Sequence, residues 1–487
     1  MPNNAYKYCA LLVALSVTAV HLLIAPMVDL SVDEAHYALY AYFPELSYFD
    51  HPPLIGWLLW LLTPWGLDEF TLRLPAAAIY LLCSGLLYHL TSSRIDQGSP
   101  LKGLVAVSIF SLAPMVQLLG FGLVPEFPLL LWTLMIALLG ERLDADSPVS
   151  HWLLFGLCIG LAGLSKYTAV LLVPSLVLYW LIQHRLGRLL CTRGLWACAL
   201  LAAALISPVI IWNYQHEWAS FLYQIDHAGG GEWEFTELLK AMLVQLVTYS
   251  PLLVVGGIVA LRDIATSGMR SLLACLALPV LLFVVMGAGN GKSLPHWTLI
   301  AWTLLIPAVS HWVVDRWGQK NVRWLAIGGT ALSALLSILI LILAACKPLG
   351  LMPWSAPALR DLVGWKQAAQ RASELKREHL PDDGVLMVHN WARASRIAWY
   401  AWPEPVQVLD GRPGQFAYWY GVPNEHSQGI LVRDNVKRNN TEPYQKMGFH
   451  CDFLEQQSIA IDDVVINRFD YYLCRHNTAE QHGKDRN

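Results

Sequence analysis

Long apolar runs without charged residues constrain this chain more than any other feature. Apolar residues make up 55% of the 487 positions, charged residues only 14%, and the mean hydropathy is +0.43. A segment of about 20 apolar residues is what a bilayer requires of one helical span. We therefore predict a polytopic α-helical membrane protein and exclude a disordered chain, a coiled coil and a secreted disulfide scaffold.

Eleven apolar runs bounded by charged or turn residues are predicted to span the membrane. They cover approximately residues 8–27, 73–91, 103–120, 124–140, 151–164, 168–183, 195–213, 238–261, 271–287, 296–314 and 324–345. The first run is long enough to remain as an anchor, and we expect it to be retained. After Lys347 charge rises and short β-type runs alternate with a helical stretch. The predicted domains are a transmembrane domain with catalytic outer loops over residues 1–346 and an extracytoplasmic soluble α/β domain over residues 347–487.

The loops that alternate between the spans differ in charge. One set holds twelve cations: Lys7, Arg94, Lys102, Arg142, Arg185, Arg188, Arg193, Arg262, Arg270, Arg316, Lys320 and Arg323. The other set holds four: Arg73, Lys166, Lys240 and Lys292. Cytoplasmic loops carry the excess of Lys and Arg, so the second set and the C-terminal domain are predicted to lie outside the plasma membrane, which in a bacterium is the inner membrane. Acidic residues gather in these outer loops, which places the expected chemistry there. A net charge of −3 argues against a nucleic-acid partner.

The first outer loop carries two adjacent carboxylates, Asp33 and Glu34. Such a pair next to a membrane span could accept a proton from a hydroxyl that attacks a lipid-borne substrate. The same residues fit a simpler structural role, because Ser31 and Glu34 have the spacing of a capping box and Asp33 suits the positive end of a helix dipole. The two interpretations are compatible, since the box does not need Asp33.

Three further charged positions stand alone at the predicted outer ends of spans. Glu126 lies between Pro125 and Pro128 at the start of the fourth span, which suits either an active-site acid or a solvated helix start. Lys166 and Lys292 are placed where cations could hold a lipid phosphate, with His296 close behind Lys292. Each lysine could instead extend to the lipid headgroups.

A polar and aromatic outer segment runs from Trp212 through Asn213 and His216 to Gly231. Aromatic faces and amide or imidazole donors suit sugar rings, although an aromatic belt at the membrane surface also explains the tryptophans. His51 begins a short apolar segment between prolines, which fits an interfacial helix beneath a lipid chain or an ordinary packing helix.

Cysteine and glycine patterns leave two open structural questions. Cys451 and Cys474 in the C-terminal domain could form a disulfide in an oxidising exterior, or contribute to a zinc site with neighbouring histidines. Adjacent ligands such as His450 and Cys451 have poor geometry for one ion, which favours the disulfide. Gly156 and Gly160 have the spacing of a helix-packing motif, within this chain or with another.

The motifs together resemble the GT-C superfamily of membrane glycosyltransferases, in particular the bacterial family 39 branch that includes dolichyl-phosphate-mannose protein mannosyltransferases and aminoarabinose transferases. The resemblance rests on these segments: Val32-Asp-Glu-Ala-His-Tyr37, Phe49-Asp-His-Pro-Pro-Leu54, Thr71-Leu-Arg-Leu-Pro75, Val124-Pro-Glu-Phe-Pro-Leu129, Gly163-Leu-Ser-Lys166, Trp212-Asn-Tyr-Gln-His216 and Pro295-His-Trp297. His51 stands where the aminoarabinose branch has Lys.

The resemblance implies an inverting transfer of a sugar from a polyprenyl-phosphate donor to a hydroxyl on a lipid, glycan or protein. It implies a catalytic role for Asp33 as general base, with Glu34 and Glu126 as further acids. Lys166, Lys292 and His296 are expected to bind the donor phosphate. Contacts with the substrate are expected from His51, Tyr37, Trp212, Asn213 and His216. No cofactor is expected, although a divalent metal ion is compatible with the site. A transporter or flippase of polyprenyl-linked sugars is the alternative function.

Overall fold

The computed structural model describes residues 3–228, 232–291, 293–409, 414–435, 444–445 and 447–476. The chain divides into two compact units. The first unit comprises Met1–Ala25, Glu45–Leu58 and Phe70–Ile340, and the second comprises Pro26–Pro44, Leu59–Glu69 and Leu341–Asn487. Most of the predicted spans therefore fall in the first unit.

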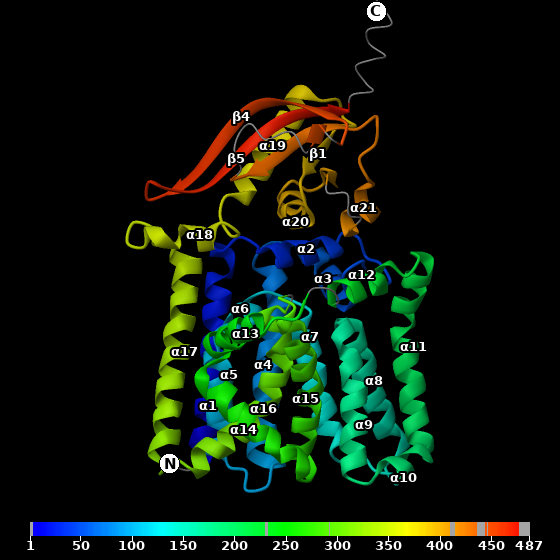
Figure 1. Ribbon diagram of the computed structural model, residues 1–487, viewed down its shortest axis with the longest axis vertical. Coiled ribbons are helices and arrows are strands. Elements are labelled where there is room, and N and C mark those ends of the chain that lie inside the picture. Colours follow the sequence, from blue (N-terminus) through cyan, green and yellow to red (C-terminus); the bar gives the residue numbers. More distant parts are fainter. Residues whose placement is uncertain are drawn as a thin grey trace, which may run out of the picture. The chain divides into compact units, whose positions relative to one another are not determined.

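The first unit is a bundle of apolar helices (Figure 1). Its helices are α1 (Asn3–Ile24), α4 (Leu74–His89), α5 (Pro100–Leu112), α6 (Pro114–Phe121), α7 (Glu126–Gly140), α8 (Val149–Ser165), α9 (Leu172–Ile182), α10 (Leu186–Leu190), α11 (Arg193–Gln215), α12 (Ala219–Ala228), α13 (Phe235–Tyr249), α14 (Pro251–Ala260), α15 (Gly268–Gly289) and α16 (Leu299–Asp315). Helices α3 (Leu54–Trp60) and α17 (Lys320–Cys346) each cross a boundary between the units.

Every predicted apolar run is helical, but not every run is one straight helix. In the part of the chain that the structure describes, six helices are long and apolar enough to cross a membrane, or up to eight if two bent pairs each count as one span. The shorter apolar helices include α7 and α8. The structure thus confirms a polytopic helical membrane protein, while the expected number of eleven spans stays a prediction.

Two runs that the sequence analysis treats as continuous spans are broken by proline. Helices α5 and α6 meet at an angle of 69°, and α13 meets the α14 segment at 109°. Pro114 and Pro251 occupy the first turn of the second helix in each pair, where the missing N–H causes no loss. Ser250, just before Pro251, has φ of 86°, a left-handed conformation that redirects the chain. The runs 103–120 and 238–261 are therefore each a bent pair of helices, and their assignment as single spans stays a prediction.

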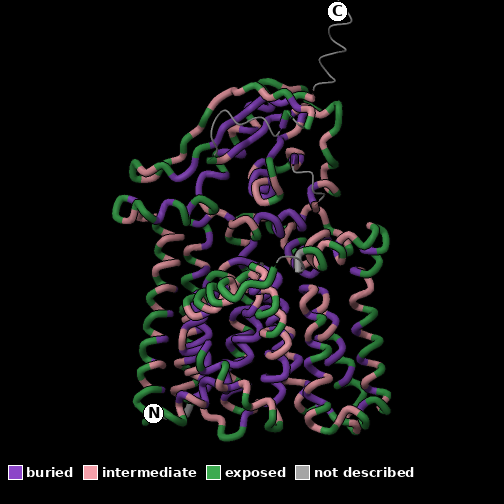
Figure 2. Tube along the Cα trace, in the orientation of Figure 1, coloured by how far each residue is buried: buried purple, intermediate pink, exposed green. Residues whose placement is uncertain are grey.

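Burial within the helical unit follows the expected arrangement of a membrane bundle (Figure 2). Helix α16 is buried along almost its whole length, whereas α17 exposes large apolar side chains such as Leu335 and Ile338. Such residues suit contact with lipid tails. The Gly156–Gly160 motif packs α8 against α11, because a Cβ at Gly156 would lie 2.6 Å from the carbonyl oxygen of Cys198. The motif therefore mediates packing within this chain.

The second unit contains a five-stranded sheet in the order β2-β1-β3-β5-β4. Its strands are β1 (Val385–Val388), β2 (Val406–Val408), β3 (Gln428–Asp434), β4 (Phe449–Ile461) and β5 (Val464–His476). Strand β1 pairs in parallel with β2 and β3, whereas β5 pairs antiparallel with β3 and β4. The same unit contains helices α18 (Ala356–Leu359), α19 (Trp365–His379), α20 (Trp391–Tyr400) and α21 (Gln415–Tyr420). A C-terminal α/β sheet domain is thus confirmed.

Helix α2 (Val32–Tyr40) belongs to the same unit as this sheet, although it comes from the first predicted outer loop. Its start has the predicted capping box, in which the Ser31 hydroxyl accepts from the Glu34 N–H and the Glu34 carboxylate accepts from the Ser31 N–H. Just after its C-terminal end, Tyr42 stacks on Trp402, which follows α20, and Phe43 stacks on Trp419 of α21. This packing explains why residues 26–44 group with the C-terminal segment rather than with the transmembrane helices.

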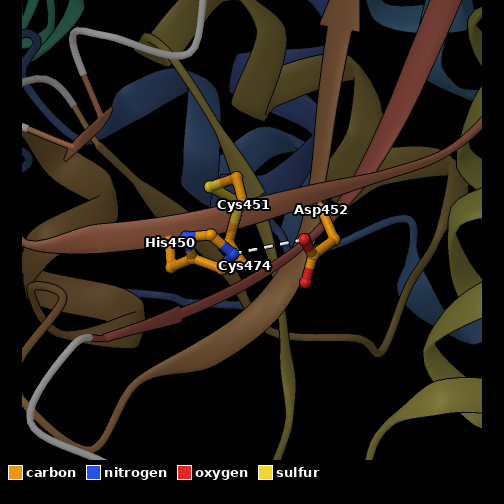
Figure 3. Close-up of a disulfide and its surroundings, with 4 residues drawn as sticks. All are labelled: His450, Cys451, Asp452 and Cys474. Carbon is orange, nitrogen blue, oxygen red and sulfur yellow. Dashed lines mark ion pairs between the residues drawn. A yellow bond between two sulfur atoms is a disulfide. The ribbon is translucent and has the colours of Figure 1, made fainter. Parts of the chain in front are cut away.

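Cys451 and Cys474 form a disulfide between neighbouring positions of β4 and β5 (Figure 3). The predicted pairing is therefore confirmed. The His450 Nε2 atom lies 3.2 Å from the Asp452 Oδ1 atom on the same strand. Because the disulfide uses both sulfur atoms, these cysteines do not provide the thiolates of a zinc site.

Removing the disulfide is expected to destabilise the sheet. The two cysteines are 23 positions apart in the sequence. Linking them lowers the entropy of the unfolded chain, which corresponds to about 3 kcal/mol in the free energy of unfolding. A Cys451→Ser/Cys474→Ser protein should therefore unfold at a lower temperature than the natural protein under non-reducing conditions. Cys346→Ser, which removes an exposed free thiol, is the control. Equal melting temperatures for all three proteins would contradict the prediction.

Candidate functional site

Three predicted site residues in the helical unit come from three different segments. Glu126 is the first residue of α7, directly after Pro125. Lys166 follows the last residue of α8, where an extended backbone separates that helix from the next turn. His296 follows Pro295 in a 3₁₀ turn, Pro295–Thr298, that leads into α16. Each side chain therefore projects from the end of a helix, where the regular backbone hydrogen bonding of the helix begins or stops.

Lys166 and His296 both contact the buried carboxylate of Glu126. Glu126 is only 4% exposed, and its Oε1 atom accepts a hydrogen bond from the Lys166 ammonium. The His296 Nε2 atom lies 3.2 Å from the same oxygen. His51 contributes a weaker electrostatic interaction with Glu126. The structure therefore brings together four residues that the sequence analysis selected separately.

The arrangement has a clear electrostatic consequence. Burying a carboxylate costs free energy of folding unless a cation compensates its negative charge. Lys166, which is itself only 8% exposed, supplies the compensating positive charge. Glu126 in turn holds the ammonium in one position. The cluster is therefore suited to present a cation and an imidazole to an anionic group, with Glu126 organising both.

Arg73 is a buried cation that the sequence analysis did not select. It is 2% exposed, and its guanidinium donates a hydrogen bond of 2.5 Å to the Ala25 carbonyl oxygen. The same group lies 4.2 Å from the centre of the Phe121 ring. Its presence in the Thr71–Pro75 motif was a usable signal, because Arg73 is the one cation of that outer loop. An Arg held this way is a candidate for binding an anion.

The predicted sugar-binding segment packs against residues 45–50 of the first outer loop. The Trp212 Nε1 atom donates to the Glu45 carboxylate at 2.6 Å, and the Trp212 ring stacks on His216 with 3.9 Å between ring centres. Ser220 donates to the Tyr48 carbonyl oxygen at 2.6 Å. Glu45, which the sequence analysis did not select, thus orients Trp212 and its stacked imidazole.

Asn213 has a more local role in this segment. Its side chain is fully buried, donates to the Val209 carbonyl oxygen at 3.0 Å and accepts from the Phe221 N–H. The bond with Phe221 joins the end of α11 to α12. The amide is thus engaged within the chain. His216 is half-buried, and its Nδ1 atom lies 2.8 Å from the Trp212 carbonyl oxygen.

The remaining predicted site residues belong to the second unit or lie outside the described residues. Asp33, Glu34 and Tyr37 belong to α2 in the second unit, with Asp33 exposed, Glu34 engaged in the capping box and Tyr37 buried among aromatic rings. Lys292 and the Gly229–Gly231 joint lie outside the described residues. Among the described residues, no group of three or more His, Cys, Asp and Glu side chains has the arrangement of a metal site.

Comparison with known proteins gives consistent similarities. Residues 50–212 match the family model described as dolichyl-phosphate-mannose-protein mannosyltransferase. The lipid A galacturonosyltransferase RgtD of Rhizobium johnstonii is 25% identical over 287 residues, which cover 56% of this chain and 58% of that protein. This chain therefore matches somewhat more than half the length of that curated relative.

Solved structures show the same fold over nearly the whole chain. ArnT from Cupriavidus metallidurans, in a crystal structure with undecaprenyl phosphate, superposes with a TM-score of 0.62 at 14% identity, covering 95% of this chain and 97% of ArnT. The mycobacterial arabinofuranosyltransferase AftD gives a TM-score of 0.52 at 16% identity, covering 96% of this chain and 40% of that protein.

The class of protein follows from the bundle, the C-terminal sheet and these similarities. The chain is a polytopic membrane protein with the fold of the GT-C glycosyltransferases. The resemblance that the motifs predict is confirmed, since the matched family model includes the segments around His51, Glu126, Lys166 and Trp212.

Separating the Glu126–Lys166 pair should destabilise the helical unit. Glu126→Gln leaves the Lys166 ammonium buried without its counter-charge. This change is expected to lower the free energy of unfolding by about 3 kcal/mol. Glu126→Gln/Lys166→Met removes both charges and should melt closer to the natural protein than Glu126→Gln does. Lys240→Met is the control, because its ion pair with Glu237 is exposed and should leave the melting temperature unchanged. A double variant that melts no higher than Glu126→Gln would contradict this account.

Proposed function

We propose that this protein is an inverting glycosyltransferase that moves a sugar from a polyprenyl-phosphate donor to a hydroxyl acceptor. The observation that carries the proposal is the buried Glu126–Lys166–His296 cluster in a chain with the fold of ArnT. The ArnT structure contains undecaprenyl phosphate, and a lipid phosphate needs the cation and donor that this cluster offers. RgtD, also similar, is a lipid A galacturonosyltransferase, so a lipid-linked saccharide is the first acceptor to test.

The proposed reaction is a single displacement at the anomeric carbon. Asp33 accepts the proton of the acceptor hydroxyl, whose oxygen forms the new bond to that carbon. The bond to the donor phosphate breaks at the same time, and its electron pair stays on the departing polyprenyl phosphate. Lys166, His296 and Lys292 stabilise the charge on that phosphate. A single displacement inverts the configuration.

Other residues have supporting roles in this proposal. Glu126 holds Lys166 and His296, while Glu34 caps the helix that carries Asp33. The Trp212–His216 stack and His51 contact the sugar. Energy comes from the activated donor, so the reaction requires no ATP. The proposal assigns charge stabilisation to the lysines and His296 and includes no resident metal ion. The alternative, a transporter or flippase of polyprenyl-linked sugars, finds no support in the comparisons, since the named relatives are transferases.

Replacing Asp33 should abolish most of the transfer. With purified protein, a labelled polyprenyl-phosphate sugar and extracted envelope lipids, Asp33→Asn should lower kcat by at least about a hundredfold, as expected for loss of a general base. Glu34→Gln is the matched control. A glutamine oxygen can still accept from the Ser31 N–H and keep the capping box, so this change should lower kcat far less than Asp33→Asn does.

The assay distinguishes three ways in which the proposal can fail. Full activity of Asp33→Asn would remove the base assignment. Transfer that requires a divalent ion after EDTA treatment would contradict the metal-free mechanism. Absence of transfer by the natural protein with every donor tested, together with donor movement across vesicles, would favour the transporter.

We also propose that the candidate site and the C-terminal domain lie outside the plasma membrane. The excess of Lys and Arg in the opposite loops supports this orientation. Cys191 and Cys346 provide a natural pair for testing it, because both are exposed free thiols on opposite predicted sides. In spheroplasts, a membrane-impermeant maleimide should label a protein that retains only Cys346 and leave one that retains only Cys191 unlabelled until lysis. The reverse pattern would overturn the orientation.

A further inference from the structure

Helix α2 is anchored to α20 by two hydrogen bonds that lie on either side of Asp33. The Leu30 N–H, three residues before Asp33, donates to the Tyr400 hydroxyl oxygen at 2.8 Å. The His36 Nδ1 atom, three residues after Asp33, lies 3.1 Å from the Ser395 hydroxyl oxygen. Both partners come from α20, so one short helix holds the segment before Asp33 and the segment after it.

The direction of the second hydrogen bond follows from the number of hydrogens available. The Ser395 hydroxyl donates its only hydrogen to the Trp391 carbonyl oxygen at 2.8 Å. Its oxygen must therefore accept from His36, which requires a hydrogen on Nδ1. His36 and Ser395 are both buried, so this bond is shielded from water.

The first hydrogen bond is also protected. Leu30 is 1% exposed, and its N–H would lose its partner without the Tyr400 hydroxyl. Burial raises the pKa of Tyr400, and the nearby Asp29, Glu69 and Glu34 carboxylates raise it further. The phenol therefore stays neutral across the range in which an enzyme would work, and its oxygen remains a constant acceptor.

Aromatic packing fixes the other end of α2. Tyr42 stacks on Trp402 with 4.1 Å between ring centres and an angle of 7°. Phe43 stacks on Trp419 from α21 at 4.8 Å. Aromatic pairs contribute about 0.5–1.5 kcal/mol beyond the area that they bury. Contacts therefore hold the chain just before α2, at His36 within it and just after it. Asp33 is exposed and lies in sequence between the two hydrogen-bonded positions.

We propose that Tyr400 and Ser395 of the C-terminal domain are positioning residues that hold the Asp33 carboxylate in its reactive orientation. The inference rests on the proposed role of Asp33 as the base. A general base loses much of its effect when it moves by about 1 Å, so an anchor three residues away can control the rate without contacting the substrate. The C-terminal domain is then part of the catalytic apparatus and not only an attached module.

The principal test compares Tyr400→Phe in two backgrounds. In the natural background, loss of the hydroxyl should lower kcat by about tenfold or more and leave KM within about twofold, because binding of the donor does not depend on Asp33. In the Asp33→Asn background the same change should have no further effect on the residual kcat, because there is no base left to position. Ser395→Ala should behave in the same way.

Matched controls separate positioning from general stability. Tyr471→Phe removes a buried hydroxyl that bonds Ala368 and Gln457 in the sheet, and Ser355→Ala removes a hydroxyl that bonds the Met352 carbonyl oxygen. Both should leave kcat and KM unchanged. Equal reductions of kcat by Tyr400→Phe and Tyr471→Phe would overturn the proposal, as would an equal effect of Tyr400→Phe in the two Asp33 backgrounds.

Hydrogen exchange tests the anchor without using activity. In the full-length protein, peptides covering residues 28–41 should exchange faster in Tyr400→Phe than in the natural protein, and not in Tyr471→Phe. Unchanged exchange would overturn the anchor itself. Faster exchange in a protein that transfers no sugar from any donor would instead show that the proposed function has failed while the anchor is real.

Discussion

The buried carboxylate of Glu126 is the interaction on which the arrangement of the helical unit's polar residues depends. An isolated carboxylate in an apolar bundle is strongly disfavoured, so its neighbours must supply charge and hydrogen bonds. Lys166 and His296 do so from two other segments that are distant in sequence. The same contacts that neutralise the acid gather a cation and an imidazole at one point, which is the chemistry that a lipid phosphate requires.

Helix breaks make this convergence possible. Glu126 begins a helix after Pro125, Lys166 lies in the extended residue after α8, and His296 lies in a turn that begins with Pro295. A side chain in the middle of a continuous span would face lipid or a neighbouring helix. At these ends the backbone turns, and the side chains can approach one another. The prolines that interrupt the apolar runs therefore shape the site as well as the spans.

The second unit combines residues from two distant parts of the chain. Helix α2 follows the first span in sequence, yet its hydrogen bonds and aromatic contacts are with α20 and α21. The capping box explains why α2 starts at Val32, and the buried aromatic face explains where it packs. The candidate base thus depends on the C-terminal domain for its position, which gives that domain a role in the proposed chemistry.

The sequence by itself determined the membrane class, the apolar helices, the α/β character of the C-terminal segment and the capping box at Ser31 and Glu34, and it favoured a disulfide between Cys451 and Cys474 that the structure then showed. These features depend on composition, periodicity and local spacing, which are read directly along the chain. Contacts between distant segments were decided only by the tertiary structure. They include the union of Glu126, Lys166 and His296, the burial of Arg73 and the attachment of α2 to α20, because each depends on how separate helices pack and on where proline bends them.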